Sequence, residues 1–387
     1  MKEVLLLAGT RPEAVKIAPV ALALADHPVL RPVIVHAGRH PDPVDRALRA
    51  FGLRPDVELD VPRAAGTRAE LLAALVPEVD RVLRVRDPAV VLVRGDSTTA
   101  LAGALAAFWR GTPVAHLDAG LRTGDPGGPL PEEGARQMIA RIAALHLAPT
   151  DDAAAALVAE GLVDREIVVT GSTAVDAVRR VAAADQPARD PGLALLERVL
   201  DERSERLVLV TAHRRESRGE PLGRVLHAVR EIVDRHPDVR VLLPAHPDPA
   251  ARSTAPEALG GHERIVVSGP LDHPDLVRAL RRAALVLTDS GGLQEEAPTF
   301  GVPVLVLRGT TERTAAVDAG YAWLVGTDPI RVLAEAGWVL GSRLRLPTGR
   351  NPFGDGHAAS RVRGALERLI GLPADFATAR LPIRIPT

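Results

Sequence analysis

Short apolar segments alternate with longer helical patterns along most of the chain, and this alternation limits the possible folds most strongly. In the first half the apolar segments predict strands at residues 3–9, 32–38, 89–96, 113–120, 144–149 and 166–171. The segments between them have helical spacing, as in residues 69–85. Continuously apolar strands separated by helices are typical of a parallel sheet that is covered on both faces. We therefore expect a doubly wound α/β unit.

The same pattern begins again after a break in the sequence. Residues 182–192 contain two prolines, a glycine and several charges, which is typical of a linker. Further strands are predicted at residues 206–213, 239–247, 264–270, 284–292, 303–310 and 322–328. A chain of 387 residues is too long for one ordinary core, so two tandem domains are expected.

The predicted domains are residues 1–181 and residues 193–350. The last helical pattern follows a turn-rich segment, so it is free to return to the first domain. Residues 357–375 are therefore assigned to that first domain.

Composition excludes several classes of protein. The 48 basic and 49 acidic residues leave a net charge of -1, which does not favour nucleic acid as a partner. The absence of cysteine excludes disulfides, thiol catalysis and Cys-ligated zinc, and fits a cytoplasmic enzyme. The sequence has no apolar run long enough to span a membrane, and the N-terminal segment lacks the pattern of a signal peptide.

Polar residues gather where the predicted strands end, which is where open α/β sheets bind ligands. After the first strand, Arg11 lies at the start of a helix, where an anion could be held, and Lys16 follows in the first turns. The alternative is a helix entry with solvated charges. A Walker-type phosphate loop is absent, so a nucleoside triphosphate site of that kind is not expected.

Several carboxylates follow the next strands of the first half. Either Asp96 or Ser97 is expected to cap a helix, but both are not needed for that role. Asp118 follows a strand directly on a glycine-rich turn, and Glu132 and Arg136 have the i, i+4 spacing of one helix face. The alternative for the last two is a surface ion pair. Neighbouring carboxylates repel one another unless cations lie among them, and such clusters separate the pKa values of catalytic acids and bases. The candidate cations are Arg11, Lys16, Arg122 and Arg136.

The second half contains a histidine and a glycine-rich block. His213 comes directly after a strand, although a lone histidine is more often structural. Within residues 288–301, a helix opens whose free N–H groups could hold phosphate oxygens, at Ser290, Gly291 and Gly292. Glu296 could accept hydrogen bonds from ribose hydroxyls, and Arg313 could pair with a diphosphate. Together, the two halves predict a cleft suited to nucleotide-sugar chemistry.

Eight sequence blocks occur in the order found in a known family. They are GTRPEAVKIAP, GDSTTALA, HLDAGLRTGD, PEEGAR, TAHRRES, TDSGGLQEEAP, GTTER and NPFGDG. With them the chain resembles the non-hydrolysing UDP-N-acetylglucosamine 2-epimerases over essentially its whole length. The resemblance implies a GT-B-like architecture of two Rossmann-type domains, with the active site in the cleft between them. It also implies a cytoplasmic homodimer that uses neither a metal nor a nicotinamide cofactor.

The resemblance further implies a reaction and a set of site residues. The family interconverts UDP-GlcNAc and UDP-ManNAc by eliminating UDP to a 2-acetamidoglucal and adding it back. The residues implied around the sugar and diphosphate are Arg11, Lys16, Asp96, Glu132, Arg136 and His213. Those implied on UDP are Ser290, Gly291, Gly292, Glu296 and Arg313, with Leu271 and Leu276 near the uracil. The acid/base candidates are Asp96, Asp118 and Glu132.

The sequence departs from the family pattern at a few positions. Asp118 stands where the family has glutamate, and Leu276 stands where an aromatic residue is common. The segments at Arg39–His40 and His246–Pro249 also differ; some bacterial members bind a second, activating UDP-GlcNAc in this region. The alternatives are a hydrolysing relative, an epimerase of a related UDP-sugar, a GT-B glycosyltransferase and a catalytically impaired nucleotide-sugar-binding protein.

Overall fold

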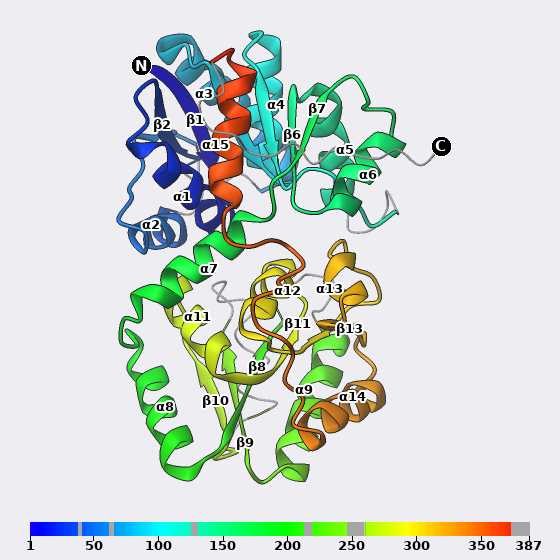
Figure 1. Cartoon of the computed structure of the whole chain (residues 1–387). Coiled ribbons are helices and arrows are strands. Elements are labelled where there is room, and N and C mark those ends of the chain that lie inside the picture. Colours follow the sequence, from blue (N-terminus) through cyan, green and yellow to red (C-terminus); the bar gives the residue numbers. More distant parts are fainter. Residues whose placement is uncertain are drawn as a thin grey trace.

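The computed structural model contains two parallel sheets, each with helices on both faces, stacked one above the other (Figure 1). The structure describes residues 1–37, 41–61, 66–124, 131–212, 219–245, 259 and 261–372. The two-unit α/β fold predicted from the sequence is confirmed.

The first sheet has the order β3-β2-β1-β4-β5-β6-β7 within the described residues. Its strands are parallel to their neighbours and comprise β1 (Lys2–Ala8), β2 (Leu30–His36), β3 (Val57–Glu58), β4 (Val90–Arg94), β5 (Val114–Leu117), β6 (Leu145–Ala148) and β7 (Glu166–Val169). The strand order reverses between β1 and β4, and this is the position at which doubly wound sheets bind ligands. Strand β3 was not predicted, because two residues are too few to show periodicity.

The second sheet repeats this arrangement with the order β10-β9-β8-β11-β12-β13. Its strands are also parallel and comprise β8 (Arg206–Thr211), β9 (Val239–Pro244), β10 (Ile265–Ser268), β11 (Ala283–Thr288), β12 (Val304–Val306) and β13 (Ala322–Leu324). The reversal here lies between β8 and β11. Each strand range predicted from the sequence overlaps one of these strands.

Alternate side chains of β1 enter the hydrophobic cores on opposite faces of the first sheet. Val4 and Leu6 pack in the cluster that contains residues of α1 (Arg11–Ala25), whereas Leu5 and Leu7 pack with residues of α3 (Arg68–Arg86) and α4 (Thr98–Trp109). Both faces are therefore buried, which explains why the strand sequence is apolar throughout. The other helices of this unit are α2 (Pro41–Arg49), α5 (Glu132–Ile142) and α6 (Asp151–Ala159).

The helices of the second unit cover its sheet in the same way. They are α8 (Pro191–Arg203), α9 (Glu220–Arg235), α11 (His273–Arg282), α12 (Gly291–Glu296), α13 (Thr314–Asp318) and α14 (Pro329–Gly341), with a short 3-10 helix at Ala297–Phe300. Helix α12 begins only three residues after β11 ends. Its first residues therefore lie at the ligand-binding edge of the second sheet.

Two helices link the units. Helix α7 (Thr173–Ala184) contributes Ala177 to the core of the first unit and Val175 to the core of the second. Helix α15 (Ala358–Leu369) returns to the first unit and packs against α1 (Figure 1). The segment between α7 and α8 is shorter than the predicted linker, because α7 continues to Ala184 and Asp190 caps α8. The domain bounds remain a prediction.

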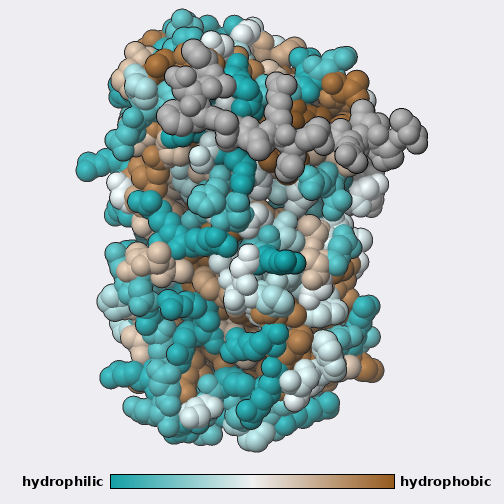
Figure 2. Space-filling view, viewed as in Figure 1, coloured by the Kyte–Doolittle hydropathy of each residue, from teal (hydrophilic) through white to brown (hydrophobic). Residues whose placement is uncertain are grey.

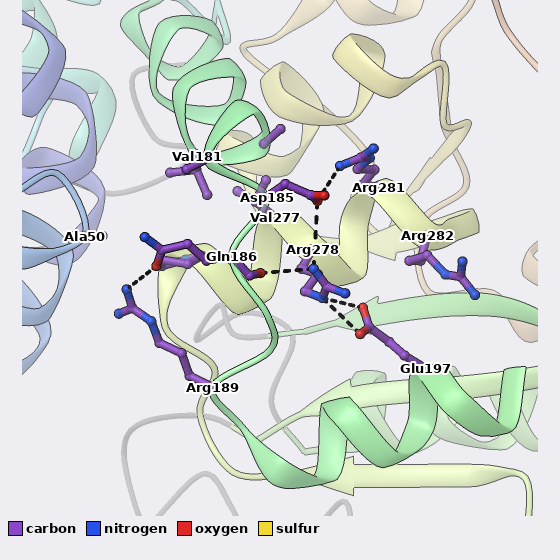
Figure 3. A pocket seen from close by; sticks show the side chains of 13 residues that line it. Ala50, Val181, Asp185, Gln186, Arg189, Glu197, Val277, Arg278, Arg281 and Arg282 are labelled. Atoms are coloured by element: carbon purple, nitrogen blue, oxygen red, sulfur yellow. Dashed lines mark hydrogen bonds and ion pairs between the residues drawn. The ribbon is translucent and has the colours of Figure 1, made fainter. Parts of the chain in front are cut away.

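A cavity of about 420 Å³ lies beside this connection, between α7, α8 and α11 (Figure 3). Its arginines are engaged by neighbouring carboxylates. Arg278 lies 2.7 Å from Glu197, and Arg281 lies 3.0 Å from Asp185 at the end of α7. These ion pairs hold α8 and the end of α7 against α11.

The outer surface is largely polar on the face that Figure 2 shows. Outside the grey atoms, hydrophilic side chains cover most of this face, and hydrophobic ones occupy separate smaller areas (Figure 2). Within the described part of the chain, no helix combines the length and apolar character needed to cross a membrane.

Candidate active site

A buried lysine connects the two units at the centre of the cleft. The Nζ atom of Lys16, in α1, lies 2.6 Å from Oδ2 of Asp118 and 2.7 Å from Oε2 of Glu295, in α12. Asp118 follows β5 and Glu295 follows β11, so the ligand-binding edges of the two sheets face each other. All three side chains are at most 3% exposed. The cleft predicted from the sequence therefore contains a charged cluster that both units build.

Asp118 is held in an unusual backbone conformation on its turn. Its φ of 60° is in the left-handed region, which aspartate tolerates better than most residues. Gly120 follows with a φ of 81°, and a Cβ atom there would lie 1.9 Å from the carbonyl oxygen of Ala153. The DAG sequence therefore fits this turn.

Two cations bond to the same oxygen of Asp118. Oδ2 accepts hydrogen bonds from Lys16 Nζ and from Arg94 Nε, each at 2.6 Å. Burial alone would raise the pKa of Asp118, but the charges of Lys16 and Arg94 outweigh burial and hold this pKa well below its usual range. Asp118 is therefore a carboxylate at neutral pH.

Ser97 caps α4, which leaves Asp96 for the cleft. The Ser97 hydroxyl accepts from the backbone N–H of Ala100 at 3.0 Å, and this confirms that only one of Asp96 and Ser97 is needed as the cap. Asp96 accepts a hydrogen bond from Arg136 Nε at 2.7 Å. Arg136 is thus one of the predicted cations that compensate the carboxylates.

The surface ion pair between Glu132 and Arg136, which was the alternative interpretation of their spacing, does not form. Arg136 bonds instead to the buried Glu133 at 2.6 Å and lies 3.5 Å from Glu312 of the second unit. Glu132 lies at the first position of α5, is one-third exposed and pairs with Arg68 of α3 at 3.1 Å. The i, i+4 spacing could not reveal that Asp96 and Glu133 would hold the guanidinium.

Glu13 supports the loops that follow β1 and β4. This buried carboxyl accepts hydrogen bonds from the Gly9 N–H and the Thr10 hydroxyl at 2.9 Å, and from the Ser97 hydroxyl. Burial raises its pKa. Glu13 therefore joins the loop that leads to Lys16 with the loop that carries Asp96.

Arg313 and the glycine-rich block meet in the second unit. The Arg313 guanidinium donates to Glu295 at 3.0 Å and also pairs with Glu312. A Cβ atom at Gly291 would lie 2.6 Å from the guanidinium carbon of Arg313. Glycine at position 291 therefore gives Arg313 room beside the start of α12, where Ser290 is the residue before the first helical position.

The residues predicted near the uracil come together around a small cavity of about 40 Å³. It is lined by Leu271 and Leu276, together with Arg11 and Ser290. Arg11 crosses between the units and donates to the backbone oxygen of Leu271 at 3.0 Å. Glu296, the last residue of α12, lies 3.7 Å from the ring of His273.

Some residues predicted from the sequence fall outside the described residues. His213 is one of them, as are Arg39, His40 and the segment 246–249. The placement of His213 in the site stays a prediction.

The residues of the cluster that the sequence analysis did not select include Arg94, Glu133, Glu295 and Glu312. Arg94 ends β4 two residues before Asp96, and a charged residue closing an apolar strand is the signal that could have revealed it. Glu133 and Glu295 each adjoin a glutamate that was chosen instead. No local signal shows which of two adjacent glutamates faces the cleft.

One group of side chains has the spacing of a metal site in the described part of the chain. Ligand atoms of His36, Asp45 and Glu58 lie within 4.8 Å of one another, at the β2–β3 edge of the first sheet. None of the acid/base candidates belongs to this group.

Two facing Rossmann-type units, with charged side chains at the ends of their parallel strands, define the GT-B-like class of α/β proteins. A family model described as UDP-N-acetylglucosamine 2-epimerase matches residues 22–367. The chain belongs to the UDP-N-acetylglucosamine 2-epimerase family.

Individual relatives agree with this assignment. The UDP-N-acetylglucosamine 2-epimerase of Bacillus subtilis is 39% identical, and the match covers 93% of each chain. A solved protein from Listeria monocytogenes is 40% identical with a TM-score of 0.89, covering 97% of this chain and all of the other. The epimerase from Neisseria meningitidis, solved with UDP-GlcNAc bound, is 31% identical with a TM-score of 0.86, covering 95% of this chain and 100% of that one.

Proposed function

We propose that the protein interconverts UDP-GlcNAc and UDP-ManNAc by elimination and re-addition of UDP. The observation that carries the proposal is Asp118, an ionised carboxylate buried between two cations where the units meet. An elimination needs a base near C2 of the sugar and cations on the departing diphosphate. Asp118 supplies the base, and Lys16 and Arg313 supply the cations.

The proposed chemistry keeps the composition of the substrate and exchanges only its C2 proton. A carboxylate removes the proton from C2, and the C2–H electron pair forms the C1–C2 double bond. The C1–O bond breaks, and its electron pair leaves with UDP. The neutral intermediate is a 2-acetamidoglucal. UDP then attacks C1 again as a proton is returned to the opposite face of C2. The acid/base candidates remain Asp96, Asp118 and Glu132. His213 stays a catalytic candidate from the sequence alone, and the reaction requires no cofactor.

We assign the binding roles to the residues predicted from the sequence. We assign the sugar and diphosphate to Arg11, Lys16 and Arg136. We assign UDP to Ser290, Gly291, Gly292, Glu296 and Arg313, with Leu271 and Leu276 against the uracil. The shared cavity of Arg11, Leu271, Leu276 and Ser290 supports the last assignment.

The test is incubation with UDP-GlcNAc in D2O, followed by NMR. We expect UDP-ManNAc with deuterium at C2. Release of free sugar together with UDP would indicate a hydrolysing enzyme instead. A complete lack of exchange at C2 would refute epimerisation of this substrate.

We further propose a cytoplasmic homodimer. Phe108 and Trp109 at the end of α4 are 52% and 67% exposed, and Met138 on the neighbouring α5 is 52% exposed. Large apolar side chains on adjoining helices are typical of an interface. Sedimentation of the Trp109→Glu variant tests the dimer, since a charge at a buried interface should release monomers. Cell fractionation tests the location.

A further inference from the structure

We propose that Arg94 is the residue that positions the Asp118 carboxylate for proton transfer, by holding Oδ2 so that Oδ1 stays available to the substrate. The inference rests on the proposed function, because it assigns Asp118 to the acid/base chemistry. It adds a residue that neither the motifs nor the family resemblance singled out.

The sheet itself brings the two residues together. Strands β4 and β5 are parallel neighbours, and Arg94 is in register with Leu117, the residue before Asp118. The Arg94 side chain is 12% exposed and that of Asp118 is 2% exposed. Because both backbones are fixed in one sheet, the 2.6 Å contact does not depend on how the two units are arranged.

Lys16 cannot supply this constraint alone. Its ammonium group is shared between Asp118 at 2.6 Å and Glu295 of the second unit at 2.7 Å. The position of Lys16 therefore depends on one carboxylate from each unit. Arg94 and Asp118 belong to the same unit, so their contact involves no residue of the second unit.

The contact leaves one carboxylate oxygen open. Arginine often bonds a carboxylate through two nitrogens and so covers both oxygens. Here the hydrogen bond comes from Nε, and Lys16 bonds to the same oxygen. Oδ1 is buried and has no hydrogen-bond partner among the residues that the structure describes. Buried carboxylate oxygens are ordinarily paired, so we take the unpaired Oδ1 as the atom that receives the substrate proton.

The length of the side chain makes this anchoring important. Asp118 is one methylene shorter than glutamate, and its left-handed backbone fixes where the carboxylate begins. A shorter acid has fewer rotamers with which to reach a reacting atom. Misplacement of a catalytic group by about 1 Å can cost about 100-fold in rate.

The experiment compares Arg94→Gln and Arg94→Lys with the wild type. The control is Arg86→Gln, which removes an arginine paired with Glu3 at 3.1 Å, at the amino-terminal side of the same sheet. The measurements are kcat and KM for epimerisation of UDP-GlcNAc, UDP affinity by calorimetry, the melting temperature and a crystal structure of Arg94→Gln.

We expect Arg94→Gln to lower kcat by about 100-fold, with KM and UDP affinity changed by less than about twofold. Arg94→Lys should recover part of kcat, because it restores the charge without the planar guanidinium. Arg86→Gln should keep the wild-type kcat. The crystal structure of Arg94→Gln should show the Asp118 carboxylate rotated from its wild-type position.

Two results would overturn the inference. One is an unchanged kcat in Arg94→Gln. The other is a parallel loss of kcat, UDP affinity and melting temperature, which would mean a structural role. If the wild type itself does not epimerise UDP-GlcNAc, the proposed function fails separately. The crystal structure of Arg94→Gln then tests the positioning role of Arg94 by itself, because an Asp118 carboxylate that has not moved would refute that role.

Discussion

Asp118 combines a left-handed backbone, full burial and two cations on one oxygen. Asparagine tolerates the same backbone region and has nearly the same shape, so Asp118→Asn removes the charge with little effect on the turn. We expect kcat to fall by about 100-fold or more, the range of a lost general base. C2 exchange in D2O measures this. Full activity in Asp118→Asn would show that position 118 has no acid/base role.

Gly291 is small because Arg313 occupies the space beside it. In Gly291→Ala the new methyl group would lie 2.6 Å from the guanidinium carbon, so Arg313 must move. We expect UDP binding to weaken by about tenfold, or on the order of 1.4 kcal/mol. Calorimetry with UDP measures this.

A matched control is Gly223→Ala in α9, where an added Cβ would have nothing within 4 Å. UDP affinity should be unchanged in that variant. Equal affinity of Gly291→Ala and the wild type would contradict the proposed role of Arg313 on the diphosphate.

At the scale of elements, two buried histidines face each other across β5 and β6. His116 is in register with His146, and burial lowers the pKa of His116 to about 4 and that of His146 to about 3. Both rings are neutral in the folded protein, whereas in the unfolded chain each takes up a proton near pH 6.5. Burial of the two neutral rings therefore costs no protonation energy above that pH. Below it, the unfolded chain binds protons that the folded protein cannot, so the free energy of unfolding falls.

The prediction is a loss of stability as pH falls from 6.5 toward about 4. Urea unfolding at a series of pH values measures the free energy of unfolding. His146→Leu should flatten this dependence, because leucine fills a similar volume and takes up no proton. An identical pH slope in the variant and the wild type would show that His146 does not contribute.

Across the whole molecule, Glu295 holds the two units together. It pairs with Lys16 of the first unit at 2.7 Å, accepts from the Ser172 hydroxyl and pairs with Arg313 at 3.0 Å. Glu295→Gln removes the charge that both cations share. We expect a larger radius of gyration in solution without substrate, measured by small-angle X-ray scattering.

The control for this prediction is Glu205→Gln. Glu205 pairs with Arg240 at 2.6 Å inside the second unit, and both side chains are 8% exposed. This variant removes a buried ion pair that does not cross the cleft, so the radius of gyration should stay at the wild-type value. An unchanged radius in a folded Glu295→Gln protein would contradict the role of Glu295 between the units.

Local sequence determined the strands, the two sheets and the strand ends at which the site lies. The strands could be predicted because burial on both faces of a parallel sheet requires apolar strands. The helices between them show the helical repeat of apolar residues instead. The turn at Asp118 and the cap at Ser97 are also local, since each depends on neighbouring residues.

Only the tertiary structure decided which charges meet. Lys16 pairs with Glu295 across 279 positions, Arg94 with Asp118 across 24, and Arg136 with Glu133 rather than Glu132. Periodicity reports which face of an element is buried, but an ion pair depends on the distance between elements that pack against each other. The packing of α7 into the cores of both units depends on those distances in the same way.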